Sequence, residues 1–285
     1  MTNVDQFESV FLSAIKDPFC YQATRFKNVL LITDLNASGA EALLQKARRF
    51  TAPLDHEDLS WHTLSGDLFQ TTDQLLQQVK QMSPDLIVTH RNLHSEAWRF
   101  THSLGEHLDV LAQRTRVPVL VLPHPRDTNA EVHGLDQSKR VMAVTNHLTD
   151  DHRLINHAAA FTSQGGLLFL VHIEDQAIFD RIIAAISRIP SIDTEEVRRK
   201  LSRQLLKEPH DYVSSCRRVL EEAGLPLKVE EKVAFGNHLK VYRDNVKEHQ
   251  IDLLVMNTKD DDQLAMHGLA YPLAIELRMT PLLML

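Results

Sequence analysis

Short, nearly continuous apolar runs recur along this sequence and alternate with longer stretches in which apolar residues follow helical spacing. The runs are Val29 to Thr33, Asp85 to Val88, Val117 to Leu122, Val141 to Thr145, Leu167 to Ile173 and Asp252 to Met256. Such runs are typical of strands that a parallel sheet buries on both faces. Because parallel strands need crossover helices, the pattern predicts a doubly wound open α/β sheet.

Two of the intervening helices carry a recognisable start. Ser38-x-x-Glu41 and Thr71-x-x-Gln74 both match the capping box, in which paired side chains satisfy backbone amides at the beginning of a helix. We therefore expect helices to begin at these two places.

Similar sequence segments occur twice along the chain, in the same order. Lys27 to Phe50 (KNVLLITDLNASGAEALLQKARRF) aligns without a gap with Lys139 to Thr162 (KRVMAVTNHLTDDHRLINHAAAFT). Each half also closes alike: PDLIVTH precedes VPVLVLP in the first, and IDLLVMNT precedes TPLLML in the second. The repeat predicts two α/β domains in tandem, and 285 residues are enough for two.

Composition is that of an ordinary globular protein, with 43% hydrophobic and 24% charged residues. No apolar run approaches the roughly 20 residues that cross a bilayer, so no membrane span or membrane partner is expected. The segment MTNVDQFESV lacks the basic and apolar parts of a signal peptide, and Cys20 and Cys216 do not suggest a disulfide framework. These features predict a cytoplasmic protein with free thiols.

Charge argues against nucleic acid as a partner. The net charge is −7, whereas nucleic-acid binding depends largely on clustered Lys and Arg. The most basic segment, Val197 to Lys207, alternates its charges with apolar residues at helical spacing and follows Glu195 and Glu196. A solvated helix face is the favoured interpretation.

Sixteen histidines raise the question of a metal centre. His147, His152 and His157 are five residues apart, a spacing that places them on different faces of a helix. His90 and His94 have a suitable spacing but are expected in a loop without a third ligand. No metal site is predicted, and no G-x-S-x-G elbow or Walker loop indicates an enzyme.

The chain resembles a tandem universal stress protein. The resemblance rests on an opening strand that leads to an acidic position, on a penultimate strand D-L-I-V, on a closing helix that runs into P-V-L-V, and on the duplication of all three. In the second half it extends over Glu221 to Met256, where Gly224 and Pro226 are expected to end a helix. It implies two Rossmann-like domains of the adenine nucleotide alpha hydrolase-like kind.

The first half departs from the family pattern by being short. After the helix Ser38 to Phe50, the segment LSWHTLSGD resembles the family's third strand, so one strand and one helix are missing and four parallel strands are expected. The edge or face thus exposed needs a cover. The N-terminal segment is the candidate, since apolar residues fall on one helical stripe at Val4, Phe7, Phe11 and Ile15.

The second half departs by an insertion at 174–209, which is expected to form two extra helices. Its stripe of Ile178, Ile182, Ile186 and Ile189 is assigned to packing on its own domain, with a dimer interface as the alternative. The expected organisation is an N-terminal helical arm (1–24), a degenerate first domain (25–125), a linker (126–138) and a second domain (139–285).

Family members that bind ATP carry a loop of the form G-x-x-G and, further on, G-S or G-T, in which backbone amides and a helix start receive the phosphates. Here the later glycine of the first half is Gly105, but Glu106 follows it, and Asn92 and Ser95 replace the earlier glycines. The second half has Gly268 followed by Leu269, and three carboxylates at 260–262. Both ATP-binding motifs are therefore degenerate.

The resemblance also marks the end of the opening strand, where an acid contacts the adenosine in nucleotide-binding members. Asp34 keeps this acid and Asn146 replaces it. The candidate ligand-binding residues that the resemblance implies are Thr33, Asp34, Asn92, Ser95, Gly105, Glu106, Asn146, Asn257 and Gly268.

These observations predict a non-catalytic, cytoplasmic stress-response protein without a cofactor, which acts through an unknown protein partner or a small-molecule ligand. Its halves, or two chains, would pair through the closing strands Val117 to Leu122 and Pro281 to Leu285. The alternative is a protein that keeps ATP or AMP in the first pocket. An enzyme acting on an adenylated substrate ranks last, because only fold analogy supports it.

Overall fold

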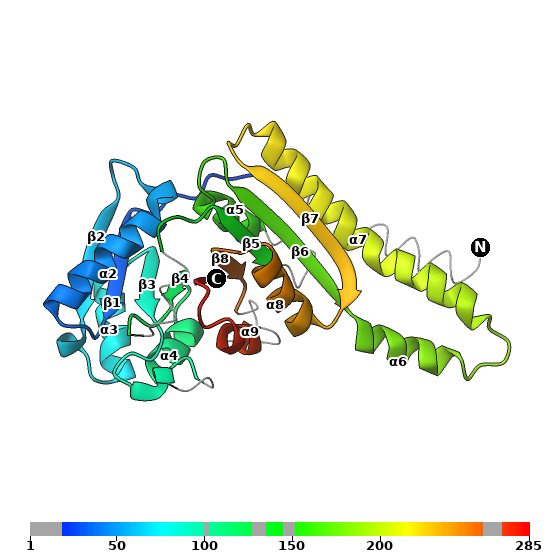
Figure 1. Cartoon of the computed structure of the whole chain (residues 1–285), viewed down its shortest axis with the longest axis horizontal. Helices are drawn as coiled ribbons and strands as arrows, with labels where there is room; N and C mark the ends of the chain where they lie inside the picture. The colour runs from blue at the N-terminus through cyan, green and yellow to red at the C-terminus, as the bar shows by residue number, and fades with distance from the viewer. Residues whose placement is uncertain (1–18, 100–102, 127–134, 145–151, 259–269) are drawn as a thin grey trace.

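A single mixed sheet runs through the described part of the protein, with strands in the order β2-β1-β3-β4-β9-β8-β5-β6-β7 (Figure 1). The structure is a computed structural model and describes residues 19–99, 103–126, 135–144, 152–258 and 270–285. Neighbouring strands are parallel except at one place, where β4 and β9 are antiparallel.

The first half supplies four strands. Its elements are β1 (Asn28–Thr33), α2 (Ala37–Phe50), β2 (Ser60–Ser65), α3 (Thr72–Met82), β3 (Leu86–His90), α4 (Glu106–Arg114) and β4 (Val119–Leu122), with short 3-10 turns at Ala52–Leu54, Gly66–Leu68 and Glu96–Arg99. The capping box of Thr71 and Gln74 is present at α3. The one expected at Ser38 is not, because the Asn36 side chain accepts the Gly39 amide and caps α2 instead.

The second half supplies five strands. Its elements are β5 (Arg140–Val144), α5 (His152–Phe161), β6 (Leu167–Asp175), α6 (Gln176–Ile186), α7 (Thr194–Glu222), β7 (Lys228–Gly236), α8 (His238–Glu248), β8 (Leu253–Met256), α9 (Ala270–Glu276) and β9 (Leu282–Met284). In the first half β2 lies beside β1 as β6 lies beside β5, and the described residues contain no counterpart of β7 there. The first half thus has four strands, as the sequence predicts.

The two halves meet through their closing strands. Leu120 of β4 lies opposite Leu283 of β9, and the flanking residues continue the antiparallel register. Both strands are fully buried, so the junction is the centre of a continuous apolar sheet. A local twofold-like arrangement follows, with β2 at one edge and β7 at the other.

Helices cover both faces of this sheet, and each cover is continuous across the halves. One face carries α3, α4, α8 and α9, whose apolar residues form a single buried cluster with alternate strand residues. The other carries α2, α5 and α7 in a second cluster. Ser138, buried between the halves, donates its hydroxyl toward the carbonyls of Phe50 and Phe161 and so joins the ends of α2 and α5.

Residues 19–26, which we call the strap, lie along α5. Phe19 packs edge-on against His152, and Phe26 packs against His157 and Phe161. The strap therefore packs on a helix of the second half. The predicted stripe at residues 4–15 lies outside the described residues. β2 is mostly exposed, as an edge strand.

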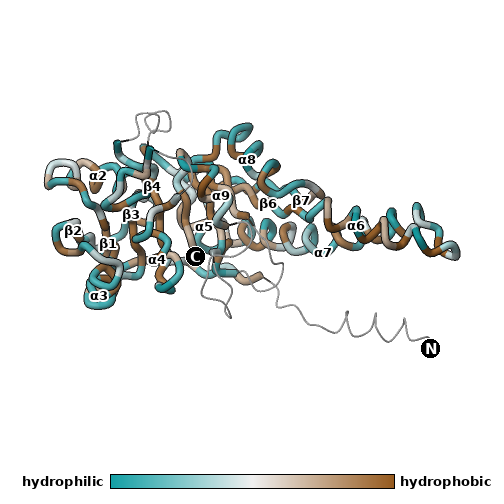
Figure 2. The backbone as a smooth tube through the Cα atoms, turned by 90° about the horizontal axis from the view of Figure 1, so that it is seen from below, coloured by the Kyte–Doolittle hydropathy of each residue, from teal (hydrophilic) through white to brown (hydrophobic). Residues whose placement is uncertain are grey.

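The insertion forms α6 and the first part of α7, which project beyond the sheet (Figures 1 and 2). The second extra helix does not end near Pro209. It is the first part of α7, which is 29 residues long and contains Pro209 in its interior. Pro209 is buried, and the following turns bury Val213, Cys216 and Leu220, which outweighs the one backbone hydrogen bond that a proline lacks.

The isoleucine stripe does not pack on its own domain, so the favoured interpretation of it is wrong. Ile178, Ile182 and Ile189 are 50%, 40% and 45% exposed, and Ile186 is only partly buried. The residues of α6 that do face the core are Phe179, which contacts Phe235, and Ile183. The projecting geometry leaves the opposite side of α6 without a partner from the described sheet.

No helix among the described residues is long and apolar enough to span a bilayer. Cys20 is exposed, Cys216 is buried, and neither forms a disulfide bond.

Candidate functional site

The carboxyl ends of β1 and β3 bring Asp34 and His90 together. His90 is the last residue of β3, not a loop residue as expected, and its Nε2 lies 3.0 Å from Thr33 Oγ1 and 3.2 Å from Asp34 Oδ1. Its Nδ1 lies 3.0 Å from the carbonyl oxygen of Arg91. Both ring nitrogens of His90 therefore lie close to oxygen atoms, and Nε2 faces Thr33 and Asp34 together.

The two oxygens of the Asp34 carboxylate differ: Oδ2 accepts a hydrogen bond, whereas the buried Oδ1 lies 3.2 Å from His90 Nε2 without forming a hydrogen bond. Burial raises its pKa, but the hydrogen bond and charge of His90 and the backbone amide of His94 outweigh this effect and hold the pKa well below its ordinary value. The His94 amide donates to Asp34 Oδ2 at 3.0 Å. Asp34 is therefore held in its ionised form by its protein neighbours.

Gly66, just after β2, closes the space beside Asp34. A methyl group added at Gly66 would come within 2.7 Å of the Asp34 Cα and 2.8 Å of His94 Cε1. Such distances are shorter than any van der Waals contact, so backbone and imidazole already fill this position. Residue 66 therefore has to be a glycine for β2 to pack against Asp34 and His94.

The loop after β3 holds the positions that correspond to the family's glycines. Asn92 and His94 have positive φ angles of 58° and 55°. Asn92 is buried, and its amide donates to the Leu104 carbonyl while its side chain donates to Ser103. Ser95 is exposed, and its hydroxyl accepts the Ala97 amide. The loop is thus closed by bonds within itself.

Gly105 is the N-cap of α4 and needs to be a glycine. Its φ angle is 93°, and an added Cβ would lie 2.7 Å from the Cα of Asn92. No side chain caps the helix, but Glu106 and Asp109 place two carboxylates in its first turn. Burial raises the pKa of Asp109 to about 6. Carboxylates there occupy the positive end of the helix dipole that a phosphate would use.

Three rings pack where the phosphate end of a nucleotide would approach α4. Phe69 lies 4.9 Å from His94 and 5.6 Å from His107, measured between ring centroids. Burial, followed by the nearby charge of His94, lowers the pKa of His107. The lowered pKa favours the neutral form of His107, which offers no positive charge to a phosphate.

The second half is described only in part at this edge. Asn257 follows β8, and the next residue, Thr258, donates both its amide and its hydroxyl to the carbonyl oxygen of Leu285. Asn146 and Gly268, with the three carboxylates at 260–262, lie outside the described residues. The sequence-predicted residues that the structure brings together are therefore those of the first half.

Sequence reasoning missed the partners of Asp34. The spacing of His90 and His94 raised only the possibility of a metal site, and no motif in the sequence pointed to Gly66, Phe69 or His107. The described residues contain no group of three or more His, Cys, Asp or Glu side chains that could hold a metal. A histidine at the end of a buried strand, opposite an acid at the end of another, was the available signal.

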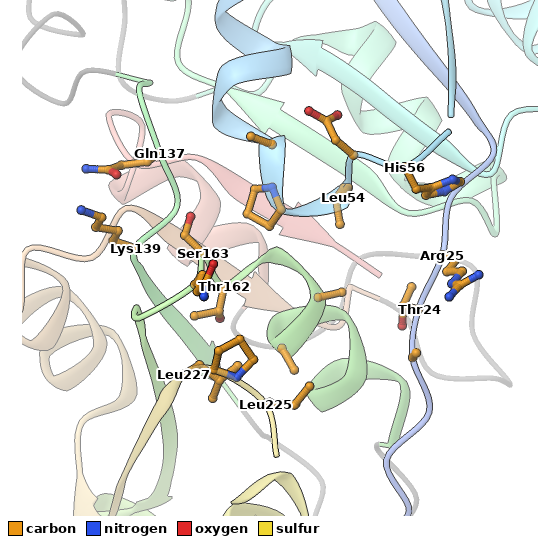
Figure 3. Close-up of a pocket in the computed structure, with 18 of the residues that line it drawn as sticks. Thr24, Arg25, Leu54, His56, Gln137, Lys139, Thr162, Ser163, Leu225 and Leu227 are labelled. Carbon is orange, nitrogen blue, oxygen red and sulfur yellow. The ribbon is translucent and has the colours of Figure 1, made fainter. Parts of the chain in front are cut away.

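A second concave site lies at the opposite, amino ends of the strands. It is a groove of about 900 Å³ between the halves (Figure 3). One wall comes from the strap and from residues 52–58, and the other from residues 137–139, 159–164 and 225–227. Leu54, Leu225 and Leu227 supply apolar surface. Nothing in the sequence pattern singled out these residues, because they come from five separate segments.

Charge in the groove is mixed. Arg25 and Lys139 lie on opposite sides of it in Figure 3 and form no ion pair with another described residue. Asp55, Glu57 and Asp58 also line it. The ring of His56 bonds to the carbonyl oxygen of Phe26 at 2.7 Å and so fixes the strap to this wall.

No protein-family model matches the sequence, and no curated protein matches it either. Solved structures do. A universal stress protein from Archaeoglobus fulgidus is 12% identical, with 90% of this chain and 97% of that chain covered and a TM-score of 0.51. A putative universal stress protein from Pseudomonas aeruginosa UCBPP-PA14 is 10% identical, with 91% and 93% covered and a TM-score of 0.53. A protein of unknown function from Pseudomonas aeruginosa PAO1 is 12% identical, with 91% of this chain and 92% of that chain covered and a TM-score of 0.53.

These comparisons show an α/β fold of the universal stress protein kind over most of the chain. Identities of 10–12% show the fold alone. What the protein binds or does has to be argued from its own residues.

Proposed function

We propose that this protein is a non-catalytic, tandem stress-type protein that has lost adenine-nucleotide binding in its first half and acts by binding a protein partner or a different ligand. The observation that carries the proposal is the closed packing around Asp34. His90 Nε2 lies 3.2 Å from one carboxylate oxygen, and the His94 amide donates to the other. A methyl group at Gly66 would collide with the Asp34 Cα and the His94 ring.

The start of α4 supports the same conclusion. A phosphate at this helix start would meet Glu106, and Asp109 stands one turn further on. At an effective dielectric constant of about 20, two like charges 4 Å apart repel by about 4 kcal/mol. This repulsion opposes binding of a triphosphate at the position where the family's hydroxyl residue would favour it.

A second candidate keeps ATP or AMP in the first half. It is favoured by one observation, the absence of a side-chain cap at Gly105, which leaves backbone amides of α4 without a side-chain acceptor. Binding by this route would require His94 to move away from Gly66.

Calorimetric titration of the purified protein with Mg-ATP and with AMP distinguishes the two. A universal stress protein that binds ATP is the positive control, and mass spectrometry of the denatured sample detects any retained nucleotide. We expect no retained nucleotide and no binding that depends on Asp34. Micromolar binding that Asp34→Ala abolishes would contradict the proposal and establish the second candidate.

A further inference from the structure

The projecting helix α6 presents an apolar stripe that the described residues leave exposed (Figures 1 and 2). Ile178, Ile182 and Ile189 are 50%, 40% and 45% exposed, and Ile186 is only partly buried. Ile189 follows α6 in a turn, and its amide donates to the Ile186 carbonyl at 3.0 Å, so the four side chains continue one stripe. A contiguous exposed stripe of large apolar residues marks a surface that another element covers.

The exposed stripe has the size of one short helix. α6 has 11 residues, which correspond to a length of about 16 Å. A stable interface between folded proteins buries about 800 Å² on each partner, with roughly 20–30 residues a side. One row of four isoleucines is much smaller than that. Its expected occupant is therefore a single amphipathic segment and not a second folded copy.

Residues 1–18 lie outside the described residues, but the point at which they join the described chain is fixed. Phe19 packs edge-on against His152, the first residue of α5. Because α5 leads from β5 to the parallel strand β6, its start lies at the carboxyl edge of the sheet. α6 begins at the same edge, directly after β6. Residue 15 is four residues before Phe19 and can lie up to about 14 Å from it.

The sequence that precedes the strap matches the isoleucine stripe in spacing. Successive apolar positions are separated by three, four and four residues, at Val4, Phe7, Phe11 and Ile15. A segment that ends at the base of α6 and covers it has to run antiparallel to it. Read in that direction, the stripe has the same separations, at Ile189, Ile186, Ile182 and Ile178. Each apolar residue of the segment is then level with one isoleucine.

Charge favours the same pairing. Residues 1–18 contain three acids and one lysine. Residues 176–207, which form α6 and the first part of α7, contain seven Lys or Arg and four Asp or Glu. The two segments therefore attract each other, whereas a second copy of 176–207 on the same stripe would bring two net positive charges together.

We propose that residues 4–15 form an amphipathic helix that docks antiparallel on the isoleucine stripe of α6 in the same chain. Pro18 separates this helix from the strap, since a proline disfavours helical backbone at the residue before it. Docking covers the stripe and adds a third helix to the projecting pair of α6 and α7. The docking involves no nucleotide site, so it and the proposed function can fail separately.

Hydrogen–deuterium exchange of the full-length protein measures this docking. A helix of about 12 residues is marginal by itself, so it undocks locally and adds little to the free energy of global unfolding. Its effect is therefore expected in the exchange of the α6 amides, 176–186, and not in the denaturation midpoint.

The test variant combines Phe7→Asp with Phe11→Asp and so places two carboxylates on the apolar stripe of the segment. The matched control combines Ser9→Asp with Ser13→Asp, which adds the same charge at the same spacing on the opposite side of the helix. We expect the α6 amides to exchange about fivefold faster in the test variant and at the unchanged rate in the control. Equal rates in all three proteins, or equal acceleration in both variants, would overturn the proposal.

A disulfide trap identifies the chain that supplies the segment. In a Cys20→Ser background, Phe11→Cys is combined with Ile182→Cys, and the matched control combines Ser13→Cys with Ile182→Cys. We expect oxidation to link the first pair within one chain, with a yield about fivefold above that of the control, because only facing Cβ atoms meet the geometry of a disulfide. Mass spectrometry of the monomeric product measures the link. Equal yields, or a link mainly between two chains, would refute docking in the same chain.

Discussion

Arg91, which follows the last residue of β3 in the first half, donates from its guanidinium to the carbonyl oxygen of Ala274 in α9 of the second half. A second nitrogen donates to the Leu277 carbonyl at 3.4 Å. Arg91 is only 4% exposed, and burial, together with the charge of Arg278, lowers its pKa to about 9. The positive charge meets the negative end of α9 and ties the two halves together beneath their helical layer.

Replacing Arg91 by Gln is therefore expected to destabilise the protein. The substitution removes a charge-assisted bond to buried carbonyls and lowers the free energy of unfolding by roughly 2 kcal/mol. Chemical denaturation measures this change. Arg278→Gln is the control, since it removes the neighbouring charge that opposes Arg91 and is expected to be neutral or slightly stabilising. Equal losses in both variants would contradict the assigned role.

The Asp34 and His90 pair predicts a defined dependence on pH. The folded-state pKa of Asp34 is lowered, so its contribution to stability is present above its ordinary pKa of about 4 and is lost as pH falls below that value. We expect Asp34→Asn to cost on the order of 2 kcal/mol at pH 7 and progressively less below about pH 4. Unfolding curves of both proteins between pH 2 and 7 measure this, and a constant difference would rule the pair out as the cause.

Asp109 predicts the opposite dependence. Its folded pKa is raised to about 6 by burial, and its Oδ1 has no hydrogen-bond partner, so ionisation destabilises the fold as pH rises from about 4 to 6. Asp109→Asn is therefore expected to stabilise the protein by about 1 kcal/mol at pH 7, after allowance for its half-buried position, and to change nothing at pH 4. Melting temperatures at the two pH values test it. A gain that is equal at both would mean that charge is not involved.

Two adjacent isoleucines on α6 test whether the projecting helix is packed on one side only. Ile183 is 1% exposed and Ile182 is 40% exposed. We expect Ile183→Ala to lower the free energy of unfolding by about 2–4 kcal/mol and Ile182→Ala by less than about 1. Denaturant titration gives both values. A large loss for Ile182→Ala would show that another surface covers it in solution, and light scattering would then show whether that surface is a second copy.

Much of the architecture was predictable because local patterns and global packing agree. The buried strands β1, β3, β4, β5, β6 and β8 correspond to apolar runs in the sequence. The repeat predicted two α/β units, of which the first is the shorter. Two details of the helix ends differ from the prediction. Ser38 looked like a cap, but Asn36 is placed to accept the Gly39 amide. Pro209 looked like a helix end, but the buried residues that follow it carry α7 onward.

The sequence by itself determined the alternation of strands and helices, the duplication, and the loss of the glycine pattern in both halves, because these depend on residue type and spacing along the chain. Only the tertiary structure decided that His90 and His94 contact Asp34 and that Arg91 binds the carbonyl oxygens at the end of α9. In each case the partners are far apart in sequence, and their contact depends on how the strands are ordered and how the chain ends fold back. Hydrophobic spacing carries no information on such pairings.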